Sequence, residues 1–309
     1  MGVIQDELHK LGITYHDFSI LQDKDGVIVA RVVSGKCSYV VKCFQNNEYK
    51  REMENYRLLA ALGVPTIQVV SSTESSLLLE DIEYSPVYRI GVREDLFDLQ
   101  VACRIAGWYK QLHNQGYAYI RQQGNSMYDE ADFFTVDHIA CIKEKTGTQD
   151  APAWRLLESH YDAISDLLFR TRRTLTYNDF YYTNMVVARD KSSALMLDYN
   201  LLGKGYAYSD VRNVLSSLSE EAGNAFLDAY GEFDPIEKAL DDVVSVVVTL
   251  FLACQHDKFP GWATRLIDEI NTNFIFKIEC LRGMLRKIIN EIYRHIETKP
   301  CSGKDLRCN

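Results

Sequence analysis

Apolar residues follow a β-strand pattern in the first part of this 309-residue chain and a helical pattern in the rest, which strongly restricts its possible folds. Up to about residue 82, short runs rich in Val, Ile and Tyr alternate with turn-forming sequences. Strands are expected at 13–21, 26–33, 38–44, 64–70 and 77–82. A helix is expected after the third strand. Asn46 or Asn47 is its expected N-cap, and Gly63 with Pro65 ends it.

Long helical patterns dominate after residue 87, and no segment repeats with a period of about 20 to 50 residues, which excludes solenoids. The helical patterns cover 94–115, 151–173, 235–255 and 262–298. We therefore expect an α+β fold with two lobes. The expected organisation is a β-rich N-terminal lobe with one helix (1–82), a hinge (83–86), a helical lobe (87–299) and a frayed tail (300–309).

Composition excludes several classes of protein. The chain has 34 Lys and Arg against 43 Asp and Glu, a net charge of −9, which argues against a nucleic-acid-binding surface. The longest apolar stretch, 243–254, is shorter than the about 20 residues that span a bilayer, and residues 1–10 lack the pattern of a secretory signal, so none is expected. Eight scattered cysteines contain no Cys-x-x-Cys pair, so reduced thiols in the cytoplasm are expected rather than structural zinc.

One strand-like pattern interrupts the helical part. Two apolar runs, 184–188 and 194–198, flank a polar loop, which predicts a β-hairpin. If the hairpin is centred on Lys191, Asn184 lies opposite Asp198, with Cα atoms ~4.5–5.5 Å apart. Amide and carboxylate oxygens suit Mg²⁺. Asp179 lies in a loop just before the hairpin, so two carboxylates and one amide are expected to converge.

Each of these features alone also has a structural interpretation. An Asp at a strand end is often a turn residue. Lys42 ends an apolar strand, where a lysine is costly unless its charge is used, although an edge-strand lysine could face water. On the following helix, Glu52 lies about 60° from the centre of the buried face and Glu54 about 140° away. Glu52 is therefore the expected partner of Lys42, with a surface salt bridge as the alternative.

Together these features resemble the aminoglycoside phosphotransferase family, which is related to choline kinases and protein kinases. The resemblance covers about residues 10–295 and rests on four motifs. They are 177–184 (Tyr-Asn-Asp-Phe-Tyr-Tyr-Thr-Asn), 197–199 (Leu-Asp-Tyr), 111–113 (Gln-Leu-His) and 62–65 (Leu-Gly-Val-Pro). The first is similar to the family's catalytic loop, His-Gly-Asp, four residues and Asn. The second is similar to its Ile-Asp-Trp. A bilobal protein-kinase-like fold is implied.

The resemblance also implies roles for individual residues. Asp179 would orient and deprotonate the acceptor hydroxyl, and Asn184 with Asp198 would carry Mg²⁺. Lys42, paired with Glu52, would hold the α- and β-phosphates of ATP, or of GTP.

The segment from Glu80 to Ile82 resembles the linker whose backbone reads the purine edge. Asp25 and Gly26 lie in the turn that would cover the nucleotide. Asp210 opens a helix, where N-capping is expected, and in the family an Asp hereabouts braces the catalytic loop.

Two departures concern the catalytic loop, since Tyr177 and Asn178 replace the family's usual His and Gly. The predicted function is phosphoryl transfer from a nucleotide to a hydroxyl of a small molecule. An aminoglycoside-like, cationic acceptor is favoured by the family name, with antibiotic resistance as one consequence. The alternatives are a kinase for choline, a methylthio sugar or an amino-acid alcohol, and a non-catalytic nucleotide-binding pseudokinase. No nucleic-acid or membrane partner is expected.

Overall fold

The structure, a computed structural model, describes residues 2–297 and divides into two compact units. The first unit comprises the residues up to Asp129 together with Arg172–Phe233, and the second comprises Glu130–Thr171 and the residues from Asp234 on. None of the helices in the described part is long and apolar enough to cross a membrane. Its six described cysteines are free thiols.

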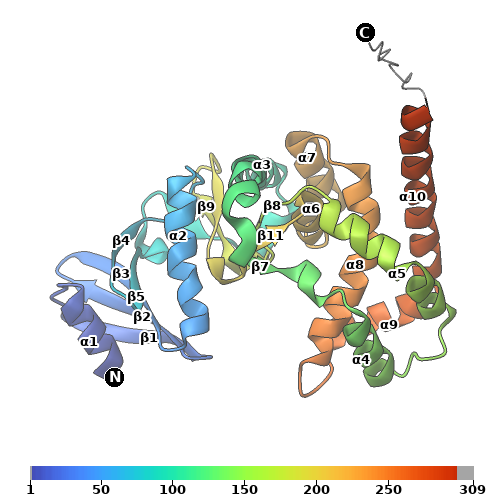
Figure 1. Ribbon diagram of the computed structural model, residues 1–309. Helices are drawn as coiled ribbons and strands as arrows, with labels where there is room; N and C mark the ends of the chain where they lie inside the picture. Colours follow the sequence, from blue (N-terminus) through green and yellow to red (C-terminus); the bar gives the residue numbers. More distant parts are fainter. Residues whose placement is uncertain (1, 298–309) are drawn as a thin grey trace, which may run out of the picture. The chain divides into compact units, whose positions relative to one another are not determined.

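A five-stranded antiparallel sheet forms the N-terminal part of the first unit (Figure 1). Its order is β1 (Asp17–Lys24), β2 (Val27–Ser34), β3 (Cys37–Phe44), β5 (Ser76–Glu80) and β4 (Val69–Ser72). The turn between β1 and β2 places Asp25 and Gly26 at φ 55° and 78°, the left-handed pair that tight hairpins require. Four of the predicted strands are therefore present with shifted ends, whereas the strand expected at 64–70 is displaced, because β4 covers only Val69–Ser72.

Helix α1 (Gly2–Lys10) covers one face of this sheet and was not predicted. Ile4 and Leu8 lie one turn apart and are fully buried against strand residues such as Val32 and Val41. Buried Glu7 fastens the same helix to β5, because its carboxylate accepts a hydrogen bond of 2.9 Å from the Ser76 hydroxyl. The opposite face of the sheet is left for the functional site.

Helix α2 (Arg51–Ala61) follows a short 3₁₀ helix, Asn47–Lys50, whose N-cap is Asn46, as predicted. The chain leaves α2 through Gly63 at φ 69°, a conformation that glycine adopts without strain. The buried face of α2 carries apolar and polar side chains together. They are Glu52, Met53, Asn55, Tyr56 and Leu59. This mixed face meets the segment Tyr199–Leu201.

The remaining part of the first unit contains helices and two small sheets. The helices are α3 (Leu99–Gln123), α6 (Ala207–Leu215) and α7 (Glu220–Tyr230). One sheet has the order β10 (Ala194–Met196), β9 (Met185–Ala188) and β6 (Tyr88–Ile90), and the other β7 (Tyr128–Asp129), β11 (Gly203–Gly205) and β8 (Thr174–Thr176). Strand pairing in the helical part is therefore more extensive than the single predicted hairpin.

The predicted hairpin is present, but its register is shifted by one residue. Met196 pairs with Met185, so Asn184 lies opposite Leu197 rather than Asp198. The Leu197 amide donates to the Asn184 carbonyl over 2.6 Å. The physical reason lies in the turn. Lys191 adopts φ 58°, and its amide donates to the Ala188 carbonyl. The connecting loop is therefore shorter than in a hairpin centred on Lys191.

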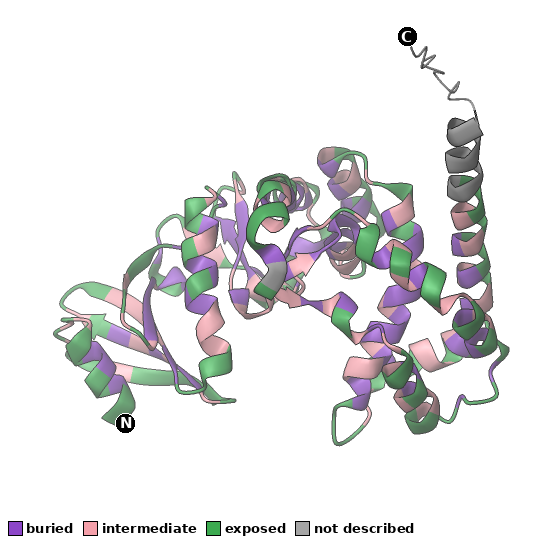
Figure 2. Ribbon diagram, in the orientation of Figure 1, coloured by how far each residue is buried: buried purple, intermediate pink, exposed green. Residues whose placement is uncertain are grey.

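The second unit is helical and is built around α8 (Pro235–Cys254), which is buried along much of its length (Figure 2). The other helices are α4 (Val136–Thr146), α5 (Pro152–Arg170), α9 (Thr264–Asn271) and α10 (Phe274–Glu297). The helix predicted over 262–298 is wrong as one element, because Thr272 leaves helical geometry at φ −125° and ψ −80° and separates α9 from α10. The predicted tail, 300–309, lies outside the described residues.

Candidate active site

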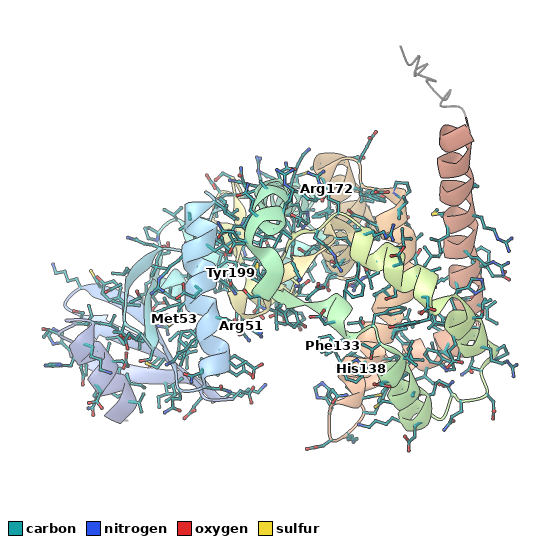
Figure 3. The ribbon with its side chains drawn as sticks, in the orientation of Figure 1. Arg51, Met53, Phe133, His138, Arg172 and Tyr199 are labelled. Atoms are coloured by element: carbon teal, nitrogen blue, oxygen red, sulfur yellow. The ribbon has the colours of Figure 1, made fainter. Side chains whose placement is uncertain are left out.

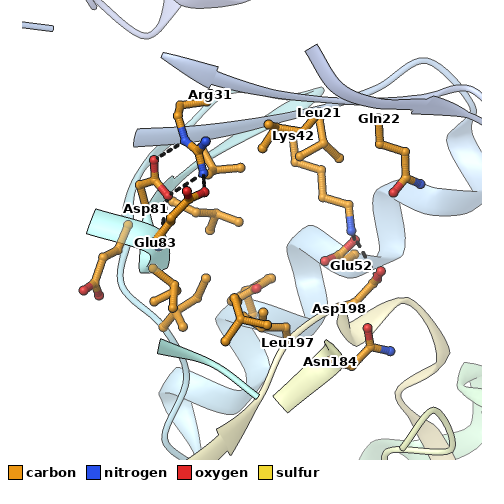
Figure 4. A pocket seen from close by; sticks show the side chains of 18 residues that line it. Leu21, Gln22, Arg31, Lys42, Glu52, Asp81, Glu83, Asn184, Leu197 and Asp198 are labelled. Carbon is orange, nitrogen blue, oxygen red and sulfur yellow. Dashed lines mark hydrogen bonds and ion pairs between the residues drawn. The ribbon is translucent and has the colours of Figure 1, made fainter. Parts of the chain in front are cut away.

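A cavity of about 290 Å³ lies on the sheet face opposite α1, within the first unit (Figure 4). Its walls come from β1, β2, β3, helix α2, the segment after β5 and the hairpin end. Apolar side chains such as Val29, Val40 and Leu79 line one part, and the charged residues Lys42 and Asp198 line another. An apolar chamber with convergent charges is typical of a small-molecule site.

Lys42 joins two carboxylates at the charged end of the cavity. Its Nζ lies 2.5 Å from an oxygen of Glu52 and 3.1 Å from Oδ1 of Asp198. Burial lowers the pKa of Lys42, but the two carboxylates outweigh burial and the net pKa is raised. Burial raises the pKa of Glu52 to about 7 against the opposing effect of Lys42. The expected pairing of Lys42 with Glu52 rather than Glu54 is what the structure contains.

Asp198 adopts a left-handed backbone conformation, φ 55° and ψ 76°, directly after the hairpin. Non-glycine residues seldom adopt it, and such strain is often held in place at functional sites. The hydroxyl of Tyr177 donates to the carbonyl of Leu197, the residue before Asp198. This backbone turn brings Asp198 to the cavity beside Asn184 although the two residues are not cross-strand partners.

Asp179 lies next to the cavity rather than among the residues that line it. Its Oδ2 accepts a hydrogen bond of 2.9 Å from the Asn184 amide, and Asn184 itself lines the cavity. Burial, followed by the charge of Asp198, raises the pKa of Asp179 to about 6. A carboxylate with a pKa near neutrality is suited to accept a proton.

Asp210 braces the loop that carries Asp179. Its carboxylate accepts the backbone amides of Tyr177 at 2.8 Å and Asn178 at 2.9 Å. The ring of buried His113 lies 3.1 Å from the same carboxylate. The expected N-capping role is wrong, because helix α6 begins at Ala207 and Asp210 lies in its first turn.

The end of β5 and the segment after it close the other end of the cavity. Glu80 and Ile82, both predicted, line it. Sequence reasoning missed Arg31 of β2, whose Nε donates to buried Asp81 over 2.7 Å and which also pairs with Glu83. The sequence did offer one indication, because Arg31 is a charged residue within the otherwise apolar strand that precedes the strand of Lys42.

A sequence profile described as a phosphotransferase enzyme family matches residues 23–240, which is more than half of the chain. The chain belongs to this family. Among curated proteins, no sequence matches the chain significantly.

Solved structures of similar fold agree with the assignment of this phosphotransferase. The streptomycin–ATP–APH(2")-IIa ternary complex shares 17% identity at a TM-score of 0.62, covering 89% of this chain and 97% of that one. Choline kinase LicA from Streptococcus pneumoniae shares 12% identity at a TM-score of 0.57, covering 90% and 98%. Macrolide 2'-phosphotransferase MphH from Brachybacterium faecium shares 16% identity at 0.58, covering 88% and 98%. These likenesses confirm the α+β, protein-kinase-like fold, and the family match confirms the phosphotransferase class.

The two departures from the family's loop have physical explanations in this phosphotransferase. Tyr177 is fully buried and uses its hydroxyl to hold the Leu197 carbonyl. Asn178 adopts φ 66°, a conformation that glycine adopts most easily and asparagine tolerates. Its side-chain amide also donates to the Leu201 carbonyl over 3.0 Å. The replacements therefore keep the loop fastened to the segment around Asp198.

The oxygen atoms at the charged end suit a Mg²⁺ ion that is held partly by the protein and partly by substrate phosphates and water. Among residues 2–297, no group of three His, Cys, Asp or Glu side chains is placed to hold a metal. Mg²⁺ usually takes one or two carboxylates together with waters and substrate phosphates. Asp198 and Asn184 offer one carboxylate and one amide oxygen at the cavity, which suits that kind of partial site.

Proposed function

We propose that this phosphotransferase moves the γ-phosphoryl group of a nucleotide to a hydroxyl group of a small molecule. The observation that carries the proposal is the contact of Lys42 with both Glu52 and Asp198 at one end of a cavity whose wall includes the apolar side chains of Val29, Val40 and Leu79. Phosphoryl transfer requires chiefly positioning and charge neutralisation, which this arrangement is suited to supply. The apolar chamber between Val29 and Leu79 would take the purine.

Asp179 is the proposed proton acceptor. In the reaction, the acceptor oxygen forms a bond to the γ-phosphorus while the bond from that phosphorus to the bridging oxygen breaks, which releases the nucleoside diphosphate. The hydroxyl proton passes to Asp179. Support comes from its raised pKa and from the Asn184 amide, which fixes the orientation of the carboxylate.

Lys42 would bind the α- and β-phosphates, and Glu52 would keep it extended toward them. Asn184 and Asp198 would hold Mg²⁺, which supplies positive charge against the phosphates when it is bound. The backbone from Glu80 to Ile82 would face the purine edge. ATP is the favoured donor, because the similar structure named above is a complex with ATP, and GTP is the alternative.

The acceptor is proposed to be an aminoglycoside-like, cationic molecule, which fits the net charge of −9. Exposed Tyr181, within the loop 177–184, offers a ring face for stacking. Choline-like alcohols are the second candidate, because choline kinase is among the similar structures. The reaction is proposed to take place in the cytoplasm, where ATP and reduced thiols are present.

The deciding experiment is a screen for nucleoside diphosphate release with ATP or GTP, Mg²⁺ and a panel of aminoglycosides, choline-like alcohols and sugar alcohols. An acceptor-dependent release that Asp179→Asn abolishes supports the proposal. Tight nucleotide binding without turnover on any acceptor of the panel would favour the pseudokinase alternative.

A further inference from the structure

Helix α2 holds both backbone polar groups of Tyr199, the residue directly after Asp198. The side-chain amide of Asn55 donates to the Tyr199 carbonyl over 2.7 Å, and this contact is buried. The Tyr199 amide in turn donates to the carboxylate of Glu52. One face of one helix therefore fixes the peptide groups on both sides of this residue.

The spacing of the two helix residues allows both to bind the backbone of Tyr199. Glu52 and Asn55 are three positions apart, so they lie on the same face of α2 and one turn from each other. Both are almost fully buried, with 1% and 7% of their surface exposed. Figure 3 shows Tyr199 close to the helix that carries Arg51, and the rings of Tyr56 and Tyr199 meet edge to face at 4.8 Å.

These hydrogen bonds matter because Asp198 adopts an uncommon backbone conformation, φ 55° and ψ 76°. Residues other than glycine are uncommon in the left-handed region, although aspartate tolerates it better than most, and contacts of the neighbouring residues help to hold the conformation. On the N-terminal side, Tyr177 holds the Leu197 carbonyl. On the C-terminal side, the hydrogen bond from Asn55 to the Tyr199 carbonyl is the corresponding restraint. Of the two helix residues that bind the Tyr199 backbone, Asn55 is the one that has no charge and does not pair with Lys42.

We infer that Asn55 is a positioning residue, which acts through the Tyr199 backbone to keep the Asp198 carboxylate turned toward the cation site. The inference rests on the proposed function, because it assigns Mg²⁺ to Asp198. It also links two parts of the site: the helix that orients Lys42 through Glu52 orients Asp198 through Asn55. Side-chain packing alone would not require an amide at this position.

The test compares Asn55→Leu, which removes the donor at similar volume, with Arg57→Ala. Arg57 lies on the exposed side of the same helix, where it forms an ion pair with Glu54. Calorimetry measures binding of a non-hydrolysable ATP analogue, first with a metal chelator and then across a Mg²⁺ titration. We expect Asn55→Leu to shift the Mg²⁺ midpoint about 10- to 100-fold higher. Metal-free binding should change less than about threefold, and Arg57→Ala should match the wild type.

Several results would overturn the inference. An unchanged Mg²⁺ midpoint in folded Asn55→Leu would show that the amide only packs, and an equal loss of binding with and without Mg²⁺ would show general damage to the pocket. If Asn55→Leu does not fold, Asn55→Ser, which is polar and smaller, must give the same Mg²⁺ shift. A wild-type protein that binds the analogue without any Mg²⁺ effect would overturn both this inference and the metal assignment. Failure to find an acceptor would instead affect only the proposed function.

Discussion

At the scale of single residues, Asp179 and Asp198 differ in surroundings although both are carboxylates of one site. Asp179 is largely buried beside Asn184, and its pKa is raised to about 6. The side chain of Asp198 is 45% exposed and in contact with Lys42. A raised pKa favours proton transfer, whereas an accessible anion favours a cation. The two residues are therefore expected to respond differently to the same substitution.

Asp179→Asn should lower turnover by about 10²–10⁴-fold while nucleotide affinity stays near the wild-type value, because only the proton acceptor is lost. Asp198→Asn should instead weaken Mg²⁺-dependent nucleotide binding. Wild-type turnover should fall as the pH drops below about 6, where Asp179 takes up a proton. Steady-state kinetics with Mg²⁺ and pH titrations measure these effects. An equal loss of Mg²⁺-nucleotide affinity in both variants would mean that the roles are misassigned.

The same Asp179→Asn variant should be more stable than the wild type at pH 8. A carboxyl whose pKa is raised on folding binds its proton more tightly in the native state, so its contribution to stability is lost as the pH rises through about 6. The gain should be about 1 kcal/mol in free energy of unfolding at pH 8 and near zero at pH 4. Urea unfolding at both pH values measures it. A variant less stable than the wild type at pH 8 would contradict the raised pKa of Asp179.

Lys42→Ala should weaken nucleotide binding by about 10- to 100-fold, the loss expected for hydrogen bonds to charged phosphates. The chain should remain folded, because Glu52 already has a raised pKa and can take up a proton instead of staying as an unpaired buried charge. The loss of stability should therefore be smaller at pH 6 than at pH 8. Circular dichroism and nucleotide titrations at both pH values provide the measurement.

At the scale of elements, close contacts between backbones decide which positions tolerate a side chain. Helix α3 crosses β8 at Gly116, where an added Cβ would lie 2.4 Å from the Leu175 amide nitrogen. Gly107, on the same helix, has nothing within 4 Å of an added Cβ. One helix thus contains a glycine required by packing and a glycine that packing does not require.

Gly116→Ala should destabilise the protein by about 1–3 kcal/mol, because two backbones must move apart. Gly107→Ala should stabilise it by about 0.5–1 kcal/mol, because alanine has the higher helix propensity. Thermal unfolding of both variants under identical conditions gives the comparison. Similar shifts in the same direction would show that α3 does not lie against β8 as closely as the structure places it.

The elements also show where sequence patterns were sufficient. The strands of the N-terminal sheet and the pairing of Lys42 with Glu52 follow from alternation and helical periodicity, which are local properties. The hairpin was predicted, but its register depended on the conformation of Lys191, and a shift of one residue cannot be read from two apolar runs. The strands β7, β8 and β11, of two or three residues each, have too few residues to give a pattern at all.

Long-range contacts limited prediction of the site in the same way. Asp210 lies in the first turn of a helix, where a capping role was reasonable, yet its carboxylate binds amides 32 and 33 residues earlier in the chain. Asn55 looks like an ordinary helix residue until Tyr199 is placed against it. Such roles depend on tertiary contacts and leave no local signal.

At the scale of the whole molecule, every residue that lines the cavity belongs to the first of the two compact units. A Mg²⁺–nucleotide complex should therefore slow amide hydrogen exchange mainly in segments of that unit, namely 21–31, 80–83 and 197–201. Helix α8, in the second unit, should change much less. Hydrogen-exchange mass spectrometry with and without ligand measures this. Protection confined to the second unit would contradict the placement of the nucleotide.

Helix α1 has a practical consequence for anyone who produces this protein. The family match begins at residue 23, after α1 and most of β1. A recombinant chain trimmed to that match would lose Ile4 and Leu8, and the outer face of the sheet around Val32 and Val41 would be exposed to water. Exposed apolar faces of this kind promote aggregation. Expression should therefore start at the first residues, with purification tags kept clear of Glu7.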